Sequence, residues 1–254
     1  MRRSIAAVLL CVLVFAAGCS AIPGTGGDGG SSETAESVPG VEDGRLADGT
    51  ALLDAHVEAA TATGFTQEIS TNATQTIDNE TAVVGQRQQV RVAPDATEYR
   101  SRVVVSGNTS GRVLTWGNRS IGVQRVEIAG GDPRYQEVQP RPAEQLAGRL
   151  LLERRLSEEF EVTDVEERED GPTLVTMEVD ALPANNTVFD DQETIENVRE
   201  FEATLVVDTA GRVRSYTATA VYDLNGQPAD YDFSLRTTNF EDPGVERPPW
   251  ATPE

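Results

Sequence analysis

Short β-rich runs separated by turn residues recur through most of this chain and restrict the folds open to it. They are expected at residues 65–71, 86–92, 97–105, 113–117, 121–128, 160–166, 174–179, 201–208, 212–224 and 229–238. Their connections carry turn chemistry, as in Asp208-Thr209-Ala210-Gly211 and Asn225-Gly226. Because most of these connections are too short for a parallel crossover, the runs predict an antiparallel meander.

The side chains of these runs also predict how the sheet is buried. In the last run Tyr231, Phe233 and Leu235 alternate with polar residues. Successive side chains of a strand point to opposite faces, so one face of this sheet is expected to be buried and the other wet.

Two stretches have helical features instead. Residues 49–63 carry a modest apolar side and are followed by Gly64, which suits a helix end. Residues 142–159 begin with a proline, which suits a first turn, and Leu146 and Leu150 belong to one apolar stripe. Together with the meander, these helices predict the α+β class.

The first nineteen residues have the layout of a cleaved secretion signal. Arg2 and Arg3 precede an uncharged run that is too short to span a bilayer, and Ala16-Ala17-Gly18 leads directly to Cys19. This ending resembles a lipobox, in which the cysteine thiol receives a lipid, although Ala16 stands where Leu is more usual. We expect residues 1–18 to be a signal peptide and Cys19 to anchor the exported protein to the outer face of the cell membrane. A plain signal peptide cut elsewhere is the alternative.

Residues 19–47 are rich in Gly, Ser and acidic residues and are expected to form a flexible tether. Within them, residues 24–29 match G-x-G-x-x-G, but no strand precedes and no helix follows to aim backbone amides at a phosphate. We therefore expect no nucleotide site there. The single α+β domain is expected to occupy residues 48–254.

The charge balance is strongly acidic. The chain has 42 acidic against 21 basic residues, and every basic residue is Arg. Molar salt shortens the Debye length to about 3 Å and screens such self-repulsion. The composition indicates adaptation to high salt and resembles that of secreted lipoproteins of halophilic archaea. An ordinary acidic bacterial surface protein is the alternative, and in either case nucleic acid is excluded as a partner.

No catalytic or metal-binding motif is apparent. His56 is the sole histidine and has no Cys or His partner nearby in the sequence, so a solvated or hydrogen-bonded helix residue is expected. Asp190, Asp191 and Glu193 fit no known calcium loop and are expected to form a solvated turn. We predict no cofactor, no metal and no enzymatic activity. A hydrolase that uses dispersed carboxylates is the catalytic alternative.

The N-x-[ST] glycosylation signal is more frequent than chance. About one such signal is expected at this composition, whereas the chain has them at Asn72, Asn79, Asn108, Asn118 and Asn185. We expect glycan on some of these sites.

The order of helix, meander, helix and further hairpins behind a lipidated tether resembles LolA/LppX-type lipoprotein carriers. The resemblance includes the closing run from Val221-Tyr222-Asp223 through Tyr231-Asp232-Phe233 to Pro248-Pro249. It implies a curved antiparallel half-barrel with two or more helices on its concave face, which holds a lipid or acyl chain.

On this resemblance, the strand aromatics become candidates for lining an apolar cavity, although alternating large aromatics more often form a packed core. These candidates are Trp116, Tyr216, Tyr222 and Phe233. The expected function is that of an exported, lipid-anchored, non-catalytic binder of lipid or another apolar ligand. A structural or adhesive glycosylated cell-envelope protein without a ligand cavity is the alternative.

Overall fold

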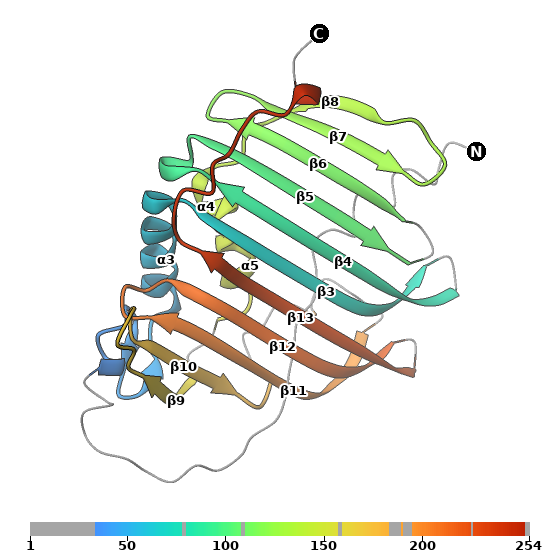
Figure 1. The fold of residues 1–254 in the computed structure, drawn as a ribbon. Helices are drawn as coiled ribbons and strands as arrows, with labels where there is room; N and C mark the ends of the chain where they lie inside the picture. Colours follow the sequence, from blue (N-terminus) through green and yellow to red (C-terminus); the bar gives the residue numbers. More distant parts are fainter. Residues whose placement is uncertain are drawn as a thin grey trace.

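The computed structural model describes residues 34–77, 80–107, 110–156, 159–182, 189, 195–224 and 226–251. Within these residues thirteen strands form one antiparallel sheet (Figure 1). The strands are β1 (Val41–Glu42), β2 (Arg45–Leu46), β3 (Phe65–Ile77), β4 (Glu80–Val92), β5 (Glu98–Ser106), β6 (Gly111–Asn118), β7 (Gly122–Ile128), β8 (Arg134–Val138), β9 (Glu161–Glu166), β10 (Leu174–Val179), β11 (Ile195–Asp208), β12 (Val213–Leu224) and β13 (Gln227–Asn239). The helices are α3 (Gly49–Thr63), α4 (Ala143–Leu146) and α5 (Arg149–Glu153), with short 3₁₀ turns η1 (Pro94–Ala96) and η2 (Pro249–Ala251).

The sheet is built from two meanders joined at their centre. Strands β3 to β8 follow one another in space as they do in sequence, and so do β9 to β13. The last strand, β13, then pairs with β3, through register partners such as Leu235 and Ile69. The sheet is curved and open, with β1 and β8 at its edges, so the predicted fold class is confirmed (Figure 1).

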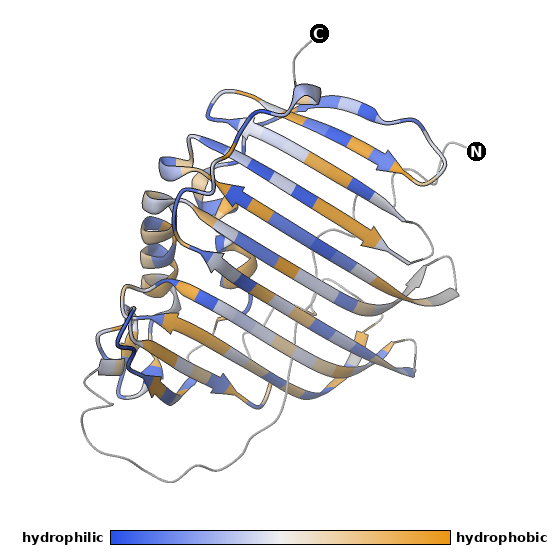
Figure 2. Cartoon of the chain, viewed as in Figure 1, coloured by the Kyte–Doolittle hydropathy of each residue, from blue (hydrophilic) through white to orange (hydrophobic). Residues whose placement is uncertain are grey.

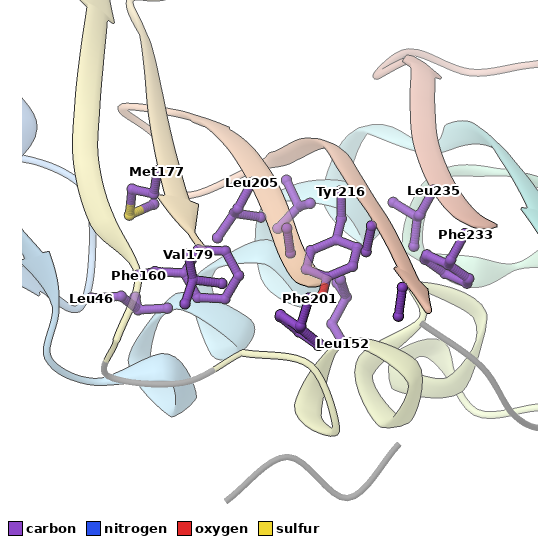
Figure 3. Packing of buried hydrophobic residues seen from close by; sticks show 14 of the residues in the cluster. Leu46, Leu152, Phe160, Met177, Val179, Phe201, Leu205, Tyr216, Phe233 and Leu235 are labelled. Atoms are coloured by element: carbon purple, nitrogen blue, oxygen red, sulfur yellow. The ribbon is translucent and has the colours of Figure 1, made fainter. Parts of the chain in front are cut away.

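The strand register divides the sheet into two faces, as the alternation in Figure 2 shows. We call the face covered by α3, α4 and α5 the inner face and the opposite one the outer face. Tyr216, Leu235 and Ile69 are register partners on the inner face, where they pack in one core with Leu52 of α3 and Leu152 of α5. Figure 3 shows the side chains of Tyr216 and Leu235 reaching from their strands toward the helices. Burial of this continuous apolar set is the main stabilising contribution to the fold.

The outer face is covered in part by the C-terminal segment. After β13 the chain crosses to η2, which lies beside β7 (Figure 1). There Trp250 and Ala251 pack against Trp116, and the guanidinium carbon of Arg247 lies 4.6 Å from the centre of the Trp116 ring. Trp250 therefore docks back on the sheet.

One predicted boundary differs from the structure at the N-terminal side. The tether was expected to extend to residue 47, but Ala35, Val38, Val41 and Leu46 are at most 3% exposed. They join the core beneath the sheet, and β2 pairs with β9. The folded body thus includes residues 34–47, because a few well-spaced apolar residues suffice to dock a segment that is otherwise polar.

The second helix was expected to be continuous over residues 142–159, and this is wrong. Gly148 adopts a left-handed conformation (φ 81°), which separates α4 from α5.

The strand β8, between residues 134 and 138, was not predicted, because its sequence RYQEV is polar and largely exposed at the sheet edge.

We predict that Gly148→Ala destabilises the protein by about 1–2 kcal/mol, because an L-residue is strained in this conformation. An added Cβ would also lie 3.4 Å from Oε1 of Gln67. Gly131→Ala is the matched control, since Gly131 has no positive φ and its added Cβ would meet only Ile128 O, at 3.6 Å. Chemical denaturation in molar salt measures the unfolding free energy of each variant. Equal unfolding free energies for Gly148→Ala and Gly131→Ala would contradict the prediction.

Candidate functional site

The four aromatic candidates for a cavity lie on different faces of the sheet. Tyr216, Tyr222 and Phe233 are on the inner face and belong to its large core. Trp116 pairs with Arg100 and Val123 and lies on the outer face, under the C-terminal segment. Trp116 therefore cannot line the same inner-face cavity as the other three candidates. Strand register decides the face, and a sequence shows the alternation without showing which set of positions faces the helices.

The three inner-face candidates are packed against other aromatic rings. Ring centres are 6.3 Å apart for Phe160 and Tyr216 and 5.8 Å apart for Tyr216 and Phe233. The ring of Phe189 lies 5.9 Å from that of Tyr222 and 6.0 Å from that of Tyr231. Such tilted and edge-on pairs are typical of a well-packed core. This part of the inner face is filled by the protein's own side chains.

A buried cation lies within this aromatic group. Arg155, which follows α5, is 5% exposed, and its guanidinium carbon is 4.3 Å from the centre of the Phe233 ring. Burial raises the pKa of the Tyr216 and Tyr231 hydroxyls, and the charge of Arg155 partly opposes this shift. Burial likewise raises the pKa of Tyr222 to about 12. All three tyrosines therefore stay neutral at physiological pH.

Charge is distributed very unequally between the two faces. Among the register-paired strand positions whose side chains the structure describes, the inner face carries one charged residue, Arg134 on the edge strand β8. The outer face carries the acids and arginines, many of them as cross-strand pairs such as Arg112 with Glu127 and Arg199 with Asp223. Each exposed pair contributes little to stability. The segregation leaves a broad uncharged face in a strongly acidic protein.

The far part of this inner face, on β5 to β7, is apolar and only partly buried. We call it the valine strip, and it consists of Val103, Val105, Val113, Val126 and Ile128. All except Val103 retain intermediate exposure, in contrast to the sealed core beneath the helices. The strip is thus an apolar part of the inner face that remains accessible. An open pocket of about 520 Å³ lies elsewhere, along residues 36–43, where acidic side chains line it.

His56 joins three elements rather than facing solvent. It is 1% exposed; its Nε2 donates to the carbonyl of Ala147 at 3.1 Å, and its Nδ1 accepts from the amide of Val213 at 3.2 Å. Neutral imidazole satisfies both bonds, with its proton on Nε2. Burial lowers the pKa of His56 from 6.5 to about 4. The sequence predicted either a solvated or a hydrogen-bonded helix residue, and His56 is the hydrogen-bonded one.

The one buried carboxylate among the described residues, Asp208, is fully used by the β11–β12 turn. Its Oδ1 accepts from the amides of Ala210 and Arg212, both at 3.0 Å. Its Oδ2 accepts from Nε and a terminal nitrogen of Arg214, at 3.0 and 2.6 Å. A carboxylate held this way stabilises a turn and has no free oxygen for acid or base chemistry.

Two of the five glycosylation signals lie on described residues. Asn72 is exposed on the outer face, register-paired with Asp232 and Gly85. Asn118 is partly buried, and its Oδ1 accepts from the amides of Ser120 and Ile121 in the β6–β7 turn. The other signals, at Asn79, Asn108 and Asn185, fall outside the described residues. So do Cys19, the acidic turn at Asp190, Asp191 and Glu193, and residues 24–29.

The described part of the chain brings together no group of three His, Cys, Asp or Glu side chains able to hold a metal ion. Of its helices, none is long and apolar enough to cross a membrane.

The chain belongs to the family of unknown function DUF7537, whose model matches residues 4–252. No curated protein matches it. Among solved structures it is similar to a DUF1329 family protein from Desulfovibrio piger, with a TM-score of 0.30, 10% identity, and coverage of 77% of this chain and 92% of that chain.

Two further solved structures are similar to this chain. One is a putative outer membrane lipoprotein-sorting protein domain from Vibrio parahaemolyticus (TM-score 0.27, 9% identity, 76% of this chain and 93% of that chain). The other is a LolA superfamily protein from Nitrosomonas europaea (TM-score 0.24, 11% identity, 75% of this chain and 94% of that chain).

We predict that His56 makes the protein lose stability in acid. The unfolded chain, with a histidine pKa near 6.5, takes up a proton before the folded protein does, so stability present above pH 6.5 is lost as pH falls toward 4. The expected loss is roughly 3 kcal/mol. The pH dependence of the unfolding free energy, compared between the native protein and His56→Gln, isolates this effect from the carboxylates. Parallel curves for the two proteins would contradict it.

Proposed function

We propose that this chain is an exported, lipid-anchored lipoprotein that binds a lipid or another apolar ligand on the valine strip without catalysing a reaction. The observation that carries this proposal is the segregation of charge. In a chain with 42 acidic residues, the strip and its neighbours on the inner face are uncharged at every described paired position except Arg134.

Exposing the apolar strip to water is unfavourable in free energy, whereas the charged outer face is well solvated. Each 100 Å² of apolar surface left in water forgoes about 2.5 kcal/mol of stabilisation. High salt strengthens this effect, because excluded salts favour burial of apolar surface. An apolar ligand on the strip would recover that free energy, and the one charged side chain beside the strip, Arg134 opposite Val126, lies on the exposed edge strand.

The register also separates the carboxylates from the strip. On the strands around it, the acids Glu98, Glu127 and Glu137 occupy outer-face positions. General acid–base catalysis needs a carboxylate within hydrogen-bond reach of the reacting group. The arrangement therefore favours binding over the hydrolase alternative.

The location we propose is the outer side of the cell membrane, with lipid on Cys19 and the acidic outer face turned to a saline medium. The support is the signal-like N-terminus ending in Cys19, the excess of acidic residues, and the exposure of Asn72 on that outer face, where a glycan would not disturb the core. We also propose that the source is a halophilic archaeon.

A structural or adhesive envelope protein is the second candidate function. It is favoured by the packing of Tyr216, Tyr222 and Phe233 against neighbouring rings, which leaves those residues unavailable to a ligand. The two functions differ in whether the valine strip takes up an apolar molecule.

Binding of the neutral fluorophore N-phenyl-1-naphthylamine tests the proposal. Val105→Glu places a charge on the strip and should weaken binding at least tenfold. Val104→Glu is the matched control, because Val104 is the preceding residue, has similar exposure and points to the outer face. It should bind as the native protein does. Absence of binding to the native protein, or equal binding by the two variants, would favour the envelope function.

Replacement of Cys19 tests the anchor. We expect Cys19→Ser to appear in the growth medium, because it lacks the thiol that would carry lipid. Cys11→Ser is the control, since Cys11 lies within the predicted signal peptide and its loss should leave the protein in the membrane fraction. Retention of Cys19→Ser on membranes would count against lipid anchoring.

A further inference from the structure

A row of uncharged polar side chains crosses the inner face beside the valine strip. Register partners place them side by side from β13 to β8, with Val90 as the one apolar member. We call these polar members the polar row: Thr237, Gln67, Ser101, Thr115, Gln124 and Gln136. Neighbouring strands are about 4.8 Å apart, so the row offers polar groups at regular intervals across the strands.

The buried end of the row has unsatisfied hydrogen-bonding groups. Thr237, Gln67 and Ser101 are 5%, 1% and 4% exposed. Oγ1 of Thr237, Oγ of Ser101 and both Oε1 and Nε2 of Gln67 have no hydrogen-bond partner in the described part of the chain. Buried polar groups are nearly always paired, and leaving one unpaired is costly. The four atoms on this face are therefore available to hydrogen-bond a group that is placed beside them.

The row opens toward the edge of the sheet. Thr115 is 1% exposed, Gln124 is partly buried and Gln136 is exposed. At this open end the side chains bond to one another, with Gln136 Nε2 donating to Gln124 Oε1 at 2.8 Å. At the buried end, Gly148 between α4 and α5 lies close to Gln67, because a Cβ added there would be 3.4 Å from Oε1 of Gln67. The row thus runs from an exposed side chain on β8 to side chains buried near the helices.

The chemistry of the unpaired atoms selects a class of ligand. A carboxamide and hydroxyls both donate and accept, which matches a hydroxyl group; a carboxylate only accepts and an ammonium only donates. The row itself has no charge that could pair with a buried ion. The valine strip lies two residues away from the polar row along each strand. For example, Val103 is two residues from Ser101, and Val113 is two residues from Thr115. A molecule that covers both therefore needs an apolar chain next to an uncharged, hydroxylated group.

We propose that the inner face binds an uncharged hydroxylated amphiphile, with its hydroxyl groups on the polar row at Gln67 and Ser101 and its apolar chain on the valine strip. This rests on the function proposed above and specifies its ligand. The hydroxyl chemistry is shared by a neutral glycolipid headgroup and by a free oligosaccharide, and the experiment separates these two sources.

The test is calorimetric titration in molar salt with the full-length protein carrying Cys19→Ser. Without the lipid, the protein needs no detergent to stay in solution before a probe is added. The probes are octyl glucoside below its micelle concentration, octanoate as an anionic chain of similar length, and maltotriose as a sugar without a chain. Octyl glucoside should bind at least tenfold more tightly than octanoate. Tight binding of octyl glucoside alone supports a lipid source, whereas comparable binding of maltotriose would point to a free sugar and overturn the proposed role of the valine strip.

Gln67→Leu supplies the decisive variant, with Gln89→Leu as its control. Gln89 lies on the outer face, where its exposed amide donates to Glu68 at 3.0 Å. Gln67→Leu should weaken octyl glucoside binding at least tenfold and raise the thermal midpoint of the unliganded protein, since it removes a buried unpaired amide. Its affinity for N-phenyl-1-naphthylamine should stay within twofold of the parent. Gln89→Leu should alter neither affinity.

Two outcomes would overturn the proposal. One is unchanged octyl glucoside affinity in Gln67→Leu, as expected if water alone occupies the row. The other is a lower thermal midpoint in that variant, which would mean that Gln67 is already hydrogen-bonded in the free protein. Either result, with N-phenyl-1-naphthylamine binding retained, removes the polar row and leaves the apolar binding function standing. Failure of the native protein to bind that fluorophore removes the underlying function instead.

Discussion

The pairing of β13 with β3 is the interaction on which the rest of the structure depends. It joins two sequential meanders into one sheet and fixes their common register, for example by placing Leu235 opposite Ile69. A shift of one residue at this junction would move every side chain of one meander to the other face. The apolar core, the uncharged inner face and the charged outer face all follow from this single register.

The outer face shows how a very acidic chain keeps its charge compatible with folding. Arginines lie across from acids on neighbouring strands, as Arg45 does with Glu161 at 2.8 Å, and the C-terminal segment covers Trp116. Charge therefore stays where water and salt can screen it. Two charged side chains of the described residues are buried. Asp208 accepts hydrogen bonds from turn amides and from Arg214, and Arg155 lies against the ring of Phe233.

Local sequence features predicted local structure well. The helix over residues 49–63 has the predicted bounds, because Asp48 caps its first amides and Gly64 ends it. Most strands were found from their apolar runs, and so was the hairpin at Asp208, whose side chain makes the turn. The break at Gly148 was missed because a glycine within an apolar stripe is compatible with a continuous helix until its φ is known. The polar row was missed because its members come from separate strands, and each one alone is an ordinary Gln, Ser or Thr.

Composition, turn residues and alternation thus determined the α+β class, the antiparallel meander and the solvated acidic surface, because these depend on residues that are neighbours in the chain. Which alternating set faces the helices was decided only by the tertiary structure, because register depends on pairing between strands far apart in sequence. That decision put Trp116 on the outer face and Tyr216 in the core. It also aligned Gln67, Ser101 and Thr115, which come from three different strands, into one row beside the valine strip.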